Sequence, residues 1–186
     1  MPKIIGNSLA EHRERTRNAL FEALSALMSH RSFDKITLSD VAARAGVGRT
    51  AVYNYFADMG ELLVAYALDE TERFIKELDE GLEGVDNPID QLAVYIRLQI
   101  EDLARRHLPP GPAMRSMLSP ESYAKLGKHV RELQMVLANI LSAAIAEHYI
   151  PENDIRELAM LVHGSLSSSA GRTEDAPDED TRERQI

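Results

Sequence analysis

The sequence contains no cysteine and no tryptophan, and aromatic residues make up only 5% of it. The absence of cysteine excludes disulfide bonds, thiol catalysis and cysteine-ligated metals. A reducing compartment is consistent with this absence. A core with few aromatic rings must be built from Leu, Ile, Val, Ala and Met, and that composition favours packed helices over a β-sandwich.

No apolar run approaches the roughly 20 residues that a membrane-spanning helix needs. Near the N-terminus only the pair Ile4 and Ile5 is apolar, which is too short for the core of a signal peptide. We therefore expect a cytoplasmic protein. With 186 residues, 44% hydrophobic and 27% charged, the chain has room for one domain, or for a small domain fused to a medium one.

The net charge of −9 is distributed unevenly along the chain. Residues 1–60 hold eight Lys and Arg against six Asp and Glu, a balance of +2, whereas residues 61–186 hold 13 against 24, a balance of −11. Such asymmetry is typical of a nucleic-acid-binding end joined to a body that avoids nucleic acid. A solvated acidic surface with chance variation explains the same numbers, so charge alone leaves both interpretations open.

Apolar residues recur at intervals of three and four along most of the chain, which predicts an all-α fold without strands. Thr37 and Asp40 form a capping-box pattern, Gly46 ends the short helix that follows, and Asn87-Pro88 starts another helix. The proline-rich residues 108–112 are not expected to be helical. The predicted helices span about 9–30, 37–45, 48–55, 58–81, 87–107, 114–118, 120–149 and 152–170.

The most informative segment is residues 37–56, where two short predicted helices meet at a glycine-containing turn. This is the layout of a helix-turn-helix, whose second helix enters the major groove of DNA. One face of the segment is apolar, with Val41, Ala42, Ala45, Val47, Ala51, Val52 and Phe56. The other face of the second helix carries donors and acceptors that suit phosphates and base edges. An ordinary helical hairpin has the same layout, so the motif by itself does not decide.

The long first helix, the run FDKITLSDVAARAGVGRTAVYNYF at 33–56 and the following Glu61-Leu62-Leu63 make residues 14–68 resemble the TetR family of transcriptional regulators. The resemblance implies an all-helical homodimer with an N-terminal DNA-reading domain. It also implies a variable C-terminal domain that binds a small effector and forms a four-helix dimer interface. Most such proteins are repressors that the effector releases from a palindromic operator, and they are not enzymes.

The resemblance also implies boundaries and contacts. The DNA-binding domain would span 1–57 and the helical effector-binding and dimerisation domain 58–170. Residues 171–186 are acidic, polar and nearly free of apolar residues, so their composition predicts a disordered tail. By position, the implied DNA contacts are Thr37, Ser39, Gly48, Arg49, Thr50, Tyr53, Asn54 and Tyr55. The first two would lie near phosphate at the start of the supporting helix. The two tyrosines would also contact phosphate, and the others would face the groove.

Two positions depart from the family pattern. Met59 stands where a phosphate-binding lysine is common, and Gly48 stands where serine is common. DNA affinity would then depend more on Arg49 and on the three arginines at 13, 15 and 17. A solvated helix face explains those three arginines as well, so both interpretations stay open.

The C-terminal half carries weaker signals. The candidate effector-binding residues lie around the proline-rich loop, where a helix break can open a cavity; they are Tyr95, Gln99, His107, Met114, Met117 and Tyr123. Plain core packing explains each of them individually. The last two helices are the expected dimer interface, because small residues permit close helix approach there; these are Ala143, Ala144, Ala146, Gly164, Ser165, Ser167 and Ser168.

We expect no metal and no cofactor. The histidines at 107, 129, 148 and 163 form no H-x-x-x-H or E-x-x-H pair, and the chain has no P-loop or dinucleotide fingerprint. Two alternatives remain, a small helical enzyme or carrier and a protein–protein adaptor. The first lacks a nucleophile–base pair, and the second would not bind duplex DNA with steep salt dependence.

Overall fold

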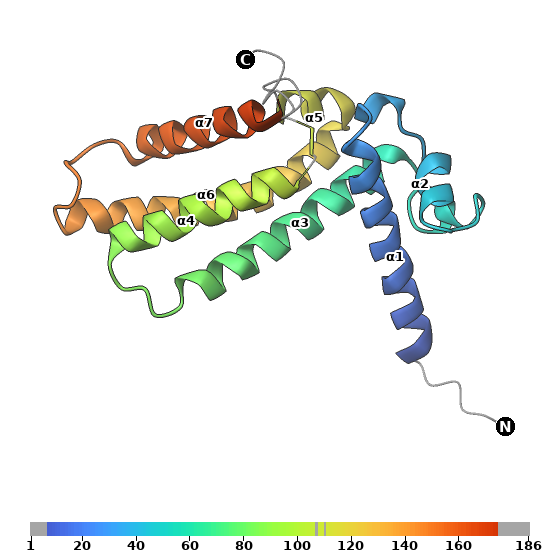
Figure 1. The fold of residues 1–186 in the computed structure, drawn as a ribbon, viewed down its shortest axis with the longest axis horizontal. Coiled ribbons are helices and arrows are strands. Elements are labelled where there is room, and N and C mark those ends of the chain that lie inside the picture. The colour runs from blue at the N-terminus through green and yellow to red at the C-terminus, as the bar shows by residue number, and fades with distance from the viewer. Residues whose placement is uncertain (1–6, 107, 110, 175–186) are drawn as a thin grey trace, which may run out of the picture. The chain divides into compact units, whose positions relative to one another are not determined.

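The computed structural model describes residues 7–106, 108–109 and 111–174, and every regular element in this part of the chain is a helix (Figure 1). The prediction of an all-α fold is confirmed. The elements are α1 (Asn7–Met28), η1 (Phe33–Lys35), α2 (Leu38–Arg44), η2 (Val52–Asn54), α3 (Met59–Leu82), α4 (Pro88–Arg105), α5 (Gly111–Met117), α6 (Pro120–Ala146) and α7 (Ile155–Glu174), of which η1 and η2 are short 3-10 helices.

The described residues fall into two compact units. The first unit contains the chain up to Thr71 together with residues 108–129, and the second contains residues 72–106 together with the chain from Val130 onward. The helices α3 and α6 each contribute residues to both units. The domain boundaries expected from the sequence, after residues 57 and 170, stay a prediction.

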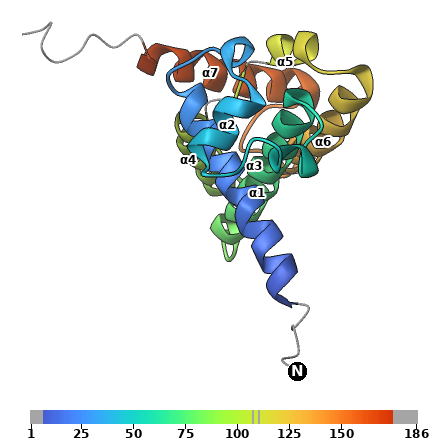
Figure 2. The ribbon, with the colours of Figure 1, turned by 90° about the vertical axis from the view of Figure 1, so that its right-hand side faces the viewer.

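The first unit is built on the C-terminal half of α1, and α2 lies beside α1 in both views (Figures 1 and 2). The ring of Phe21 lies 6.0 Å from that of Phe56 and 5.8 Å from that of Tyr66, measured between centroids. A fully buried large apolar side chain such as Phe21 stabilises the fold by about 1.5–3 kcal/mol relative to the exposed side chain. The buried cluster consists of Leu20, Phe21, Ala23, Leu24, Ile36, Leu38, Val41, Ala42, Val52, Phe56, Leu62 and Tyr66.

A second cluster of the same unit lies on another face of α3. Leu63 and Ala67 follow Leu62 and Tyr66 by one position, so helical geometry turns the two pairs to different sides. Leu118 and Leu126 complete this second cluster. The helix α5 begins at Gly111, earlier than the sequence predicted, because the first turn of a helix tolerates proline.

The second unit has its own core of Phe74, Leu78, Tyr95, Leu137, Ile140 and Leu141. Gly81 allows α3 and α4 to approach closely, since a Cβ atom at this position would lie 2.9 Å from Leu98 Cδ1. The helix α4 begins as predicted. Pro88 is its first residue, and the Asn87 side chain accepts a 2.8 Å hydrogen bond from the Ile89 N–H.

The predicted ends of the last two helices were wrong by a few residues. The helix α6 ends at Ala146, and His148 has a φ of 61°, the left-handed conformation that stops a helix. The helix α7 begins at Ile155 rather than near Pro151, because Asp154 Oδ1 accepts a 2.7 Å bond from the Arg156 N–H. The helix continues to Glu174, into the predicted tail, and residues 175–186 lie outside the described residues.

The buried face of α4 also differs from the prediction. Hydrophobic residues at intervals of three and four along 87–107 (Ile89, Leu92, Ala93, Ile96, Ile100 and Leu103) favour a buried stripe, yet Ala93 and Ile100 are exposed. Tyr95, Gln99 and Asp102 are buried instead. They recur at intervals of four and three and therefore form an equally regular helical stripe.

Candidate nucleic-acid interface

The helix α2 starts with the predicted capping box. The Asp40 N–H donates to Thr37 Oγ1 at 3.2 Å, and the Thr37 N–H and hydroxyl donate to Asp40 Oδ2 at 2.9 and 2.7 Å. The shorter Asp thus replaces the usual Glu in the reciprocal bond. These hydrogen bonds from Thr37 lower the pKa of Asp40. Thr37 is exposed and Ser39 is half-buried at this helix start.

The turn after α2 is fixed by Gly46. Its φ of +68° lies in the left-handed region that glycine tolerates best. The Gly46 N–H donates to the Ala43 carbonyl at 3.3 Å, and the Val47 N–H donates to the Ala42 carbonyl at 2.9 Å. This pair of bonds is the Schellman motif, and it directs the chain into residues 48–56.

Residues 48–56 are not the α-helix that the sequence predicted. They form consecutive turns with one 3-10 helix at Val52–Asn54, in which the Asn54 N–H donates to the Ala51 carbonyl at 3.1 Å. The intrinsic helix propensity of the segment is low, since glycine, β-branched and aromatic residues dominate it. A stretch this short does not offset the cost of nucleating a helix. We call residues 48–56 the recognition segment.

Two buried anchors orient the recognition segment. Val52 and Phe56 are buried in the core of the first unit. Between and before these anchors, four of the predicted contact residues are exposed together with Gly48; they are Arg49, Thr50, Tyr53 and Asn54. The apolar and polar faces expected from the sequence therefore occur without the expected helix.

Tyr55 differs from the other predicted contacts. Its side chain is half-buried and packs against the core cluster of the first unit. The guanidinium of Arg13, on α1, lies over the Tyr55 ring at 5.9 Å from its centroid. No local pattern in the sequence indicates this pairing, because the two residues belong to different elements.

The predicted effector residues are divided between the units. Tyr95 and Gln99 belong to the second unit, and Met114, Met117 and Tyr123 belong to the first. Met114 and Tyr123 are half-buried against the cluster around Leu63 and Leu118, while Met117 is exposed. The Arg115 guanidinium, absent from the prediction, lies 5.8 Å from the Tyr123 centroid. His107 lies outside the described residues.

A hydrogen-bonded pair between α4 and α7 in the second unit was not predicted from the sequence. The Tyr95 Oη and the His163 Nε2 share a hydrogen bond of 2.9 Å. Burial raises the pKa of Tyr95 to about 12 and lowers the pKa of His163. Both groups are therefore neutral near pH 7. The hydrogen bond crosses from α4 to α7, so no local sequence pattern reports it.

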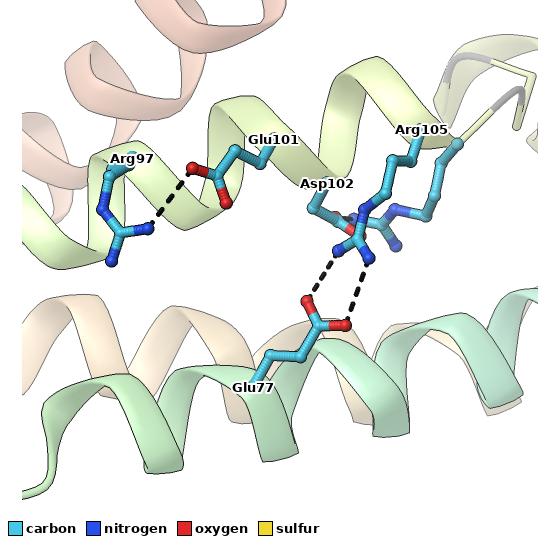
Figure 3. Close-up of polar contacts among 6 residues, drawn as sticks. Glu77, Arg97, Glu101, Asp102 and Arg105 are labelled. Carbon is cyan, nitrogen blue, oxygen red and sulfur yellow. Dashed lines mark hydrogen bonds and ion pairs between the residues drawn. The ribbon is translucent and has the colours of Figure 1, made fainter.

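An acid–arginine cluster lies at the C-terminal end of α4 (Figure 3). Both carboxylate oxygens of Glu77 accept hydrogen bonds from Arg105, at 3.2 and 2.6 Å, and this bonding lowers the pKa of Glu77. Asp102 is buried and pairs with Arg106. Burial raises the pKa of Asp102 more than the neighbouring arginines lower it. Among the described residues, no cluster of acids and histidines suits a metal ion.

The packing of α1, α2 and the recognition segment through a glycine turn defines the class of helix-turn-helix proteins. Residues 20–66 match the family model for bacterial regulatory proteins of the tetR family. The HTH-type transcriptional regulator AlkX of Mycobacterium tuberculosis is 34% identical over 68 residues, which are 37% of this chain and 32% of AlkX. The match thus spans about a third of the length of this relative. The likeness to the tetR family is therefore carried by the N-terminal part of the chain.

Solved structures share the fold over most of the chain. The fatty acid degradation regulator FadR from Bacillus halodurans superposes with a TM-score of 0.74 at 17% identity, covering 88% of each chain. FadR from Bacillus subtilis, in complex with stearoyl-CoA, has a TM-score of 0.69 at 20% identity and covers 82% of this chain and 83% of its own. At these identities the likeness concerns the fold. Among the described residues, no helix combines the length and the apolarity needed to cross a membrane.

Proposed function

We propose that the protein is a dimeric DNA-binding repressor that leaves a palindromic operator when a small-molecule effector binds. The observation that carries this proposal is the exposed polar set of the recognition segment. Arg49, Tyr53 and Asn54 are exposed while Val52 and Phe56 fix the segment to the core. Arginine and asparagine are the side chains that most often read guanine and adenine edges.

The DNA-binding domain of the proposal is residues 1–57, with Thr37 and Ser39 placed near phosphate at the start of α2. Thr37 is exposed, and its hydroxyl, which donates to Asp40 in the free protein, would donate to a phosphate oxygen in the complex. Tyr53 is largely exposed, so its hydroxyl is available to a second phosphate. Such a regulator acts in the cytoplasm, where its DNA lies, and needs no catalytic activity.

Dimerisation through α6 and α7 is supported by apolar side chains that are largely exposed in the single chain. These are Val130 and Met135 on α6, and Met160 and Leu161 on α7. Gly164 adds a site of close approach, since a Cβ atom there would meet no atom within 4 Å. Burying such a patch against a second copy removes apolar surface from water. A two-fold dimer in turn requires a palindromic site.

The effector site of the proposal lies in residues 58–170. Tyr95 and Gln99 are buried polar side chains on the inward face of α4. In most helices this face is apolar. A few placed polar groups in an apolar surrounding are typical of small-molecule sites. The stearoyl-CoA complex of the Bacillus subtilis relative is one case of this fold holding a ligand.

The test is a gel shift and footprint of the purified protein on DNA flanking its own gene, over a salt series. A protected palindrome is expected, with Arg49→Ala and Tyr53→Ala each weakening binding about tenfold and leaving the helix content unchanged. Arg97→Ala, which removes an exposed arginine from α4, is the matched control and keeps wild-type affinity.

Unchanged affinity of both Arg49→Ala and Tyr53→Ala, measured by fluorescence anisotropy at fixed salt, would remove the recognition segment from the DNA contact. A footprint over a single asymmetric half-site would argue against the dimer. Failure of the wild-type protein to select any duplex from random sequence would refute the proposed function itself.

A further inference from the structure

The two glutamines of α4 differ in how their amides are bonded. The Gln91 amide donates to the Val85 carbonyl at 2.6 Å. Gln99 is only 8% exposed, yet no hydrogen bond joins its amide to another residue in the described part of the chain. Polar groups that are buried in folded proteins nearly always have a partner. The Gln99 amide therefore keeps its hydrogen-bonding capacity for a molecule from outside the chain.

The polar side chains before and after Gln99 on the buried face of α4 are already paired. One turn earlier, Tyr95 shares the 2.9 Å hydrogen bond with His163. This pair is neutral near pH 7, because burial disfavours the charged form of both groups. About one turn later, the Asp102 carboxylate pairs with Arg106, so the two charges compensate each other. Neither pair leaves a free charge beside Gln99.

Apolar side chains form the rest of the core to which Tyr95 belongs. These are Phe74, Leu78, Leu137, Ile140 and Leu141. A charged ligand that enters such surroundings loses its hydration and gains no opposite charge in return. An uncharged ligand with one polar group loses much less, provided that this group finds a hydrogen-bonding partner.

The chemistry of the Gln99 side chain indicates what that polar group is. A carboxamide offers an acceptor oxygen and a donor N–H side by side. A second carboxamide has the same pair of groups and can form two hydrogen bonds with it, whereas an ester or a ketone only accepts.

We propose that Gln99 binds the effector, and that the effector is an uncharged molecule with a carboxamide or lactam group on an apolar body. The inference rests on the proposed function, because its ligand is the effector of that proposal. It adds the chemical class of the effector and the side chain that selects it.

The first experiment compares probes with the same alkyl chain and different polar ends. Octanamide, methyl octanoate, octanoate and octylamine are titrated into the full chain near pH 7, without DNA, by isothermal calorimetry. Octanamide is expected to bind most tightly. Methyl octanoate, which accepts but does not donate, should bind about tenfold more weakly. Octanoate and protonated octylamine should bind at least about a hundredfold more weakly, because their charges are not compensated.

Two matched variants locate the binding. Gln99→Met removes the amide and keeps a flexible side chain of similar length, and it is expected to weaken octanamide binding by at least about tenfold. Gln91→Met makes the same replacement on the same helix, at the glutamine whose amide is bonded to Val85. Its affinity for octanamide should equal that of the wild type.

The urea midpoints of the same two variants test the unbonded amide without any ligand. Gln91→Met is expected to lower the midpoint, because the hydrogen bond to the Val85 carbonyl is lost. Gln99→Met should leave the midpoint unchanged or raise it, since no bond within the chain is lost. An equal fall for both variants would overturn the inference, because it would show that the folded chain itself bonds the Gln99 amide.

Other outcomes would also overturn the inference. They are octanoate binding as tightly as octanamide, octanamide binding equally well to the wild type and to Gln99→Met, and a wild-type protein that binds no octanamide up to its solubility limit. Fluorescence anisotropy of an operator complex tests the proposed function separately. Release of the operator by octanoate alone would leave the proposed function standing and refute the inference. Octanamide bound through Gln99 without release would support the site and refute the proposed effector response.

Discussion

Neutralising Asp102 is expected to destabilise the protein far more than neutralising either of two other acids paired with arginines of α4. Arg97 and Glu101 are 58% and 54% exposed, and Arg105 and Glu77 are 52% and 31% exposed (Figure 3). The side chains of Arg106 and Asp102 are only 12% and 3% exposed. Each member of an isosteric series replaces a carboxylate with an amide of the same shape, so only the burial of the ion pair differs; the series is Glu101→Gln, Glu77→Gln and Asp102→Asn.

The magnitudes follow from that burial. An exposed pair contributes about 0.2–1 kcal/mol, so Glu101→Gln is expected to cost less than about 0.5 kcal/mol and Glu77→Gln up to about 1 kcal/mol. Asp102→Asn leaves the Arg106 guanidinium buried without its partner, which costs about 3–5 kcal/mol. The Phe74 ring, 5.9 Å from that guanidinium, compensates a part of the loss, so a value near the lower end is expected.

The raised pKa of Asp102 adds a further expectation. Because burial outweighs the arginines there, the ion pair stabilises the fold little compared with an apolar pair of similar volume. The double variant Asp102→Leu with Arg106→Met is therefore expected to lie within about 1 kcal/mol of the wild type, although Asp102→Asn alone does not.

Urea unfolding followed by far-ultraviolet circular dichroism measures these differences. Protein concentration must be held fixed, because dimerisation adds concentration-dependent stability. The slope m should stay constant across the series, so that midpoint shifts report stability. A cost for Asp102→Asn no larger than that for Glu101→Gln would refute the reasoning, since it would mean that Arg106 becomes hydrated once its partner is gone.

Two further predictions concern the Gly46 turn and His163. Gly46→Ala is expected to lower the free energy of unfolding by about 1–2 kcal/mol through backbone strain alone, since a Cβ atom there meets no atom within 4 Å. Gly84→Ala, at a φ of +74°, is the control and should show a similar loss in thermal unfolding. Only the Gly46 variant should weaken DNA binding. Burial lowers the pKa of His163 below its usual 6.5, so the unfolded chain takes up a proton first, and stability should fall as pH drops below about 6.5. His163→Gln should flatten that dependence in urea midpoints, and an unchanged slope would contradict it.

The helix starts were predictable because their interactions are local. Thr37 and Asp40 satisfy each other within three residues. At the start of α3 the Glu61 N–H donates to Asp58 Oδ1 at 2.8 Å, and the Glu61 carboxylate accepts a hydrogen bond from the Ala57 N–H. The Asn87 cap has the same short range. A capping bond depends on the order of residues within one turn and on little else.

The recognition segment shows what such local sequence patterns cannot predict. The alternation of apolar and polar residues correctly predicted which side chains are buried, because Val52 and Phe56 have to reach the core of α1 whatever the backbone does. The same alternation fits an α-helix and a series of 3-10 turns about equally well, since both bring positions three and four apart to one side. The periodicity therefore predicted the exposed face and not the backbone conformation.

The C-terminal half was less predictable because the buried polar groups of α4 depend on partners, one of which lies far away in the sequence. On α4 two stripes compete for the interior, and the stripe with Ile100 is the more hydrophobic. Tyr95 is buried nevertheless, because His163, 68 residues later, shares a hydrogen bond with it, and Asp102 is buried because Arg106 pairs with it. Without such partners the burial of these groups costs several kcal/mol, on the order of 2–7 for a neutral polar group. Which stripe faces inward is therefore decided by the partner on α7 as much as by hydrophobicity, and a substitution at His163 should change the packing of α4 as well as its polar contacts.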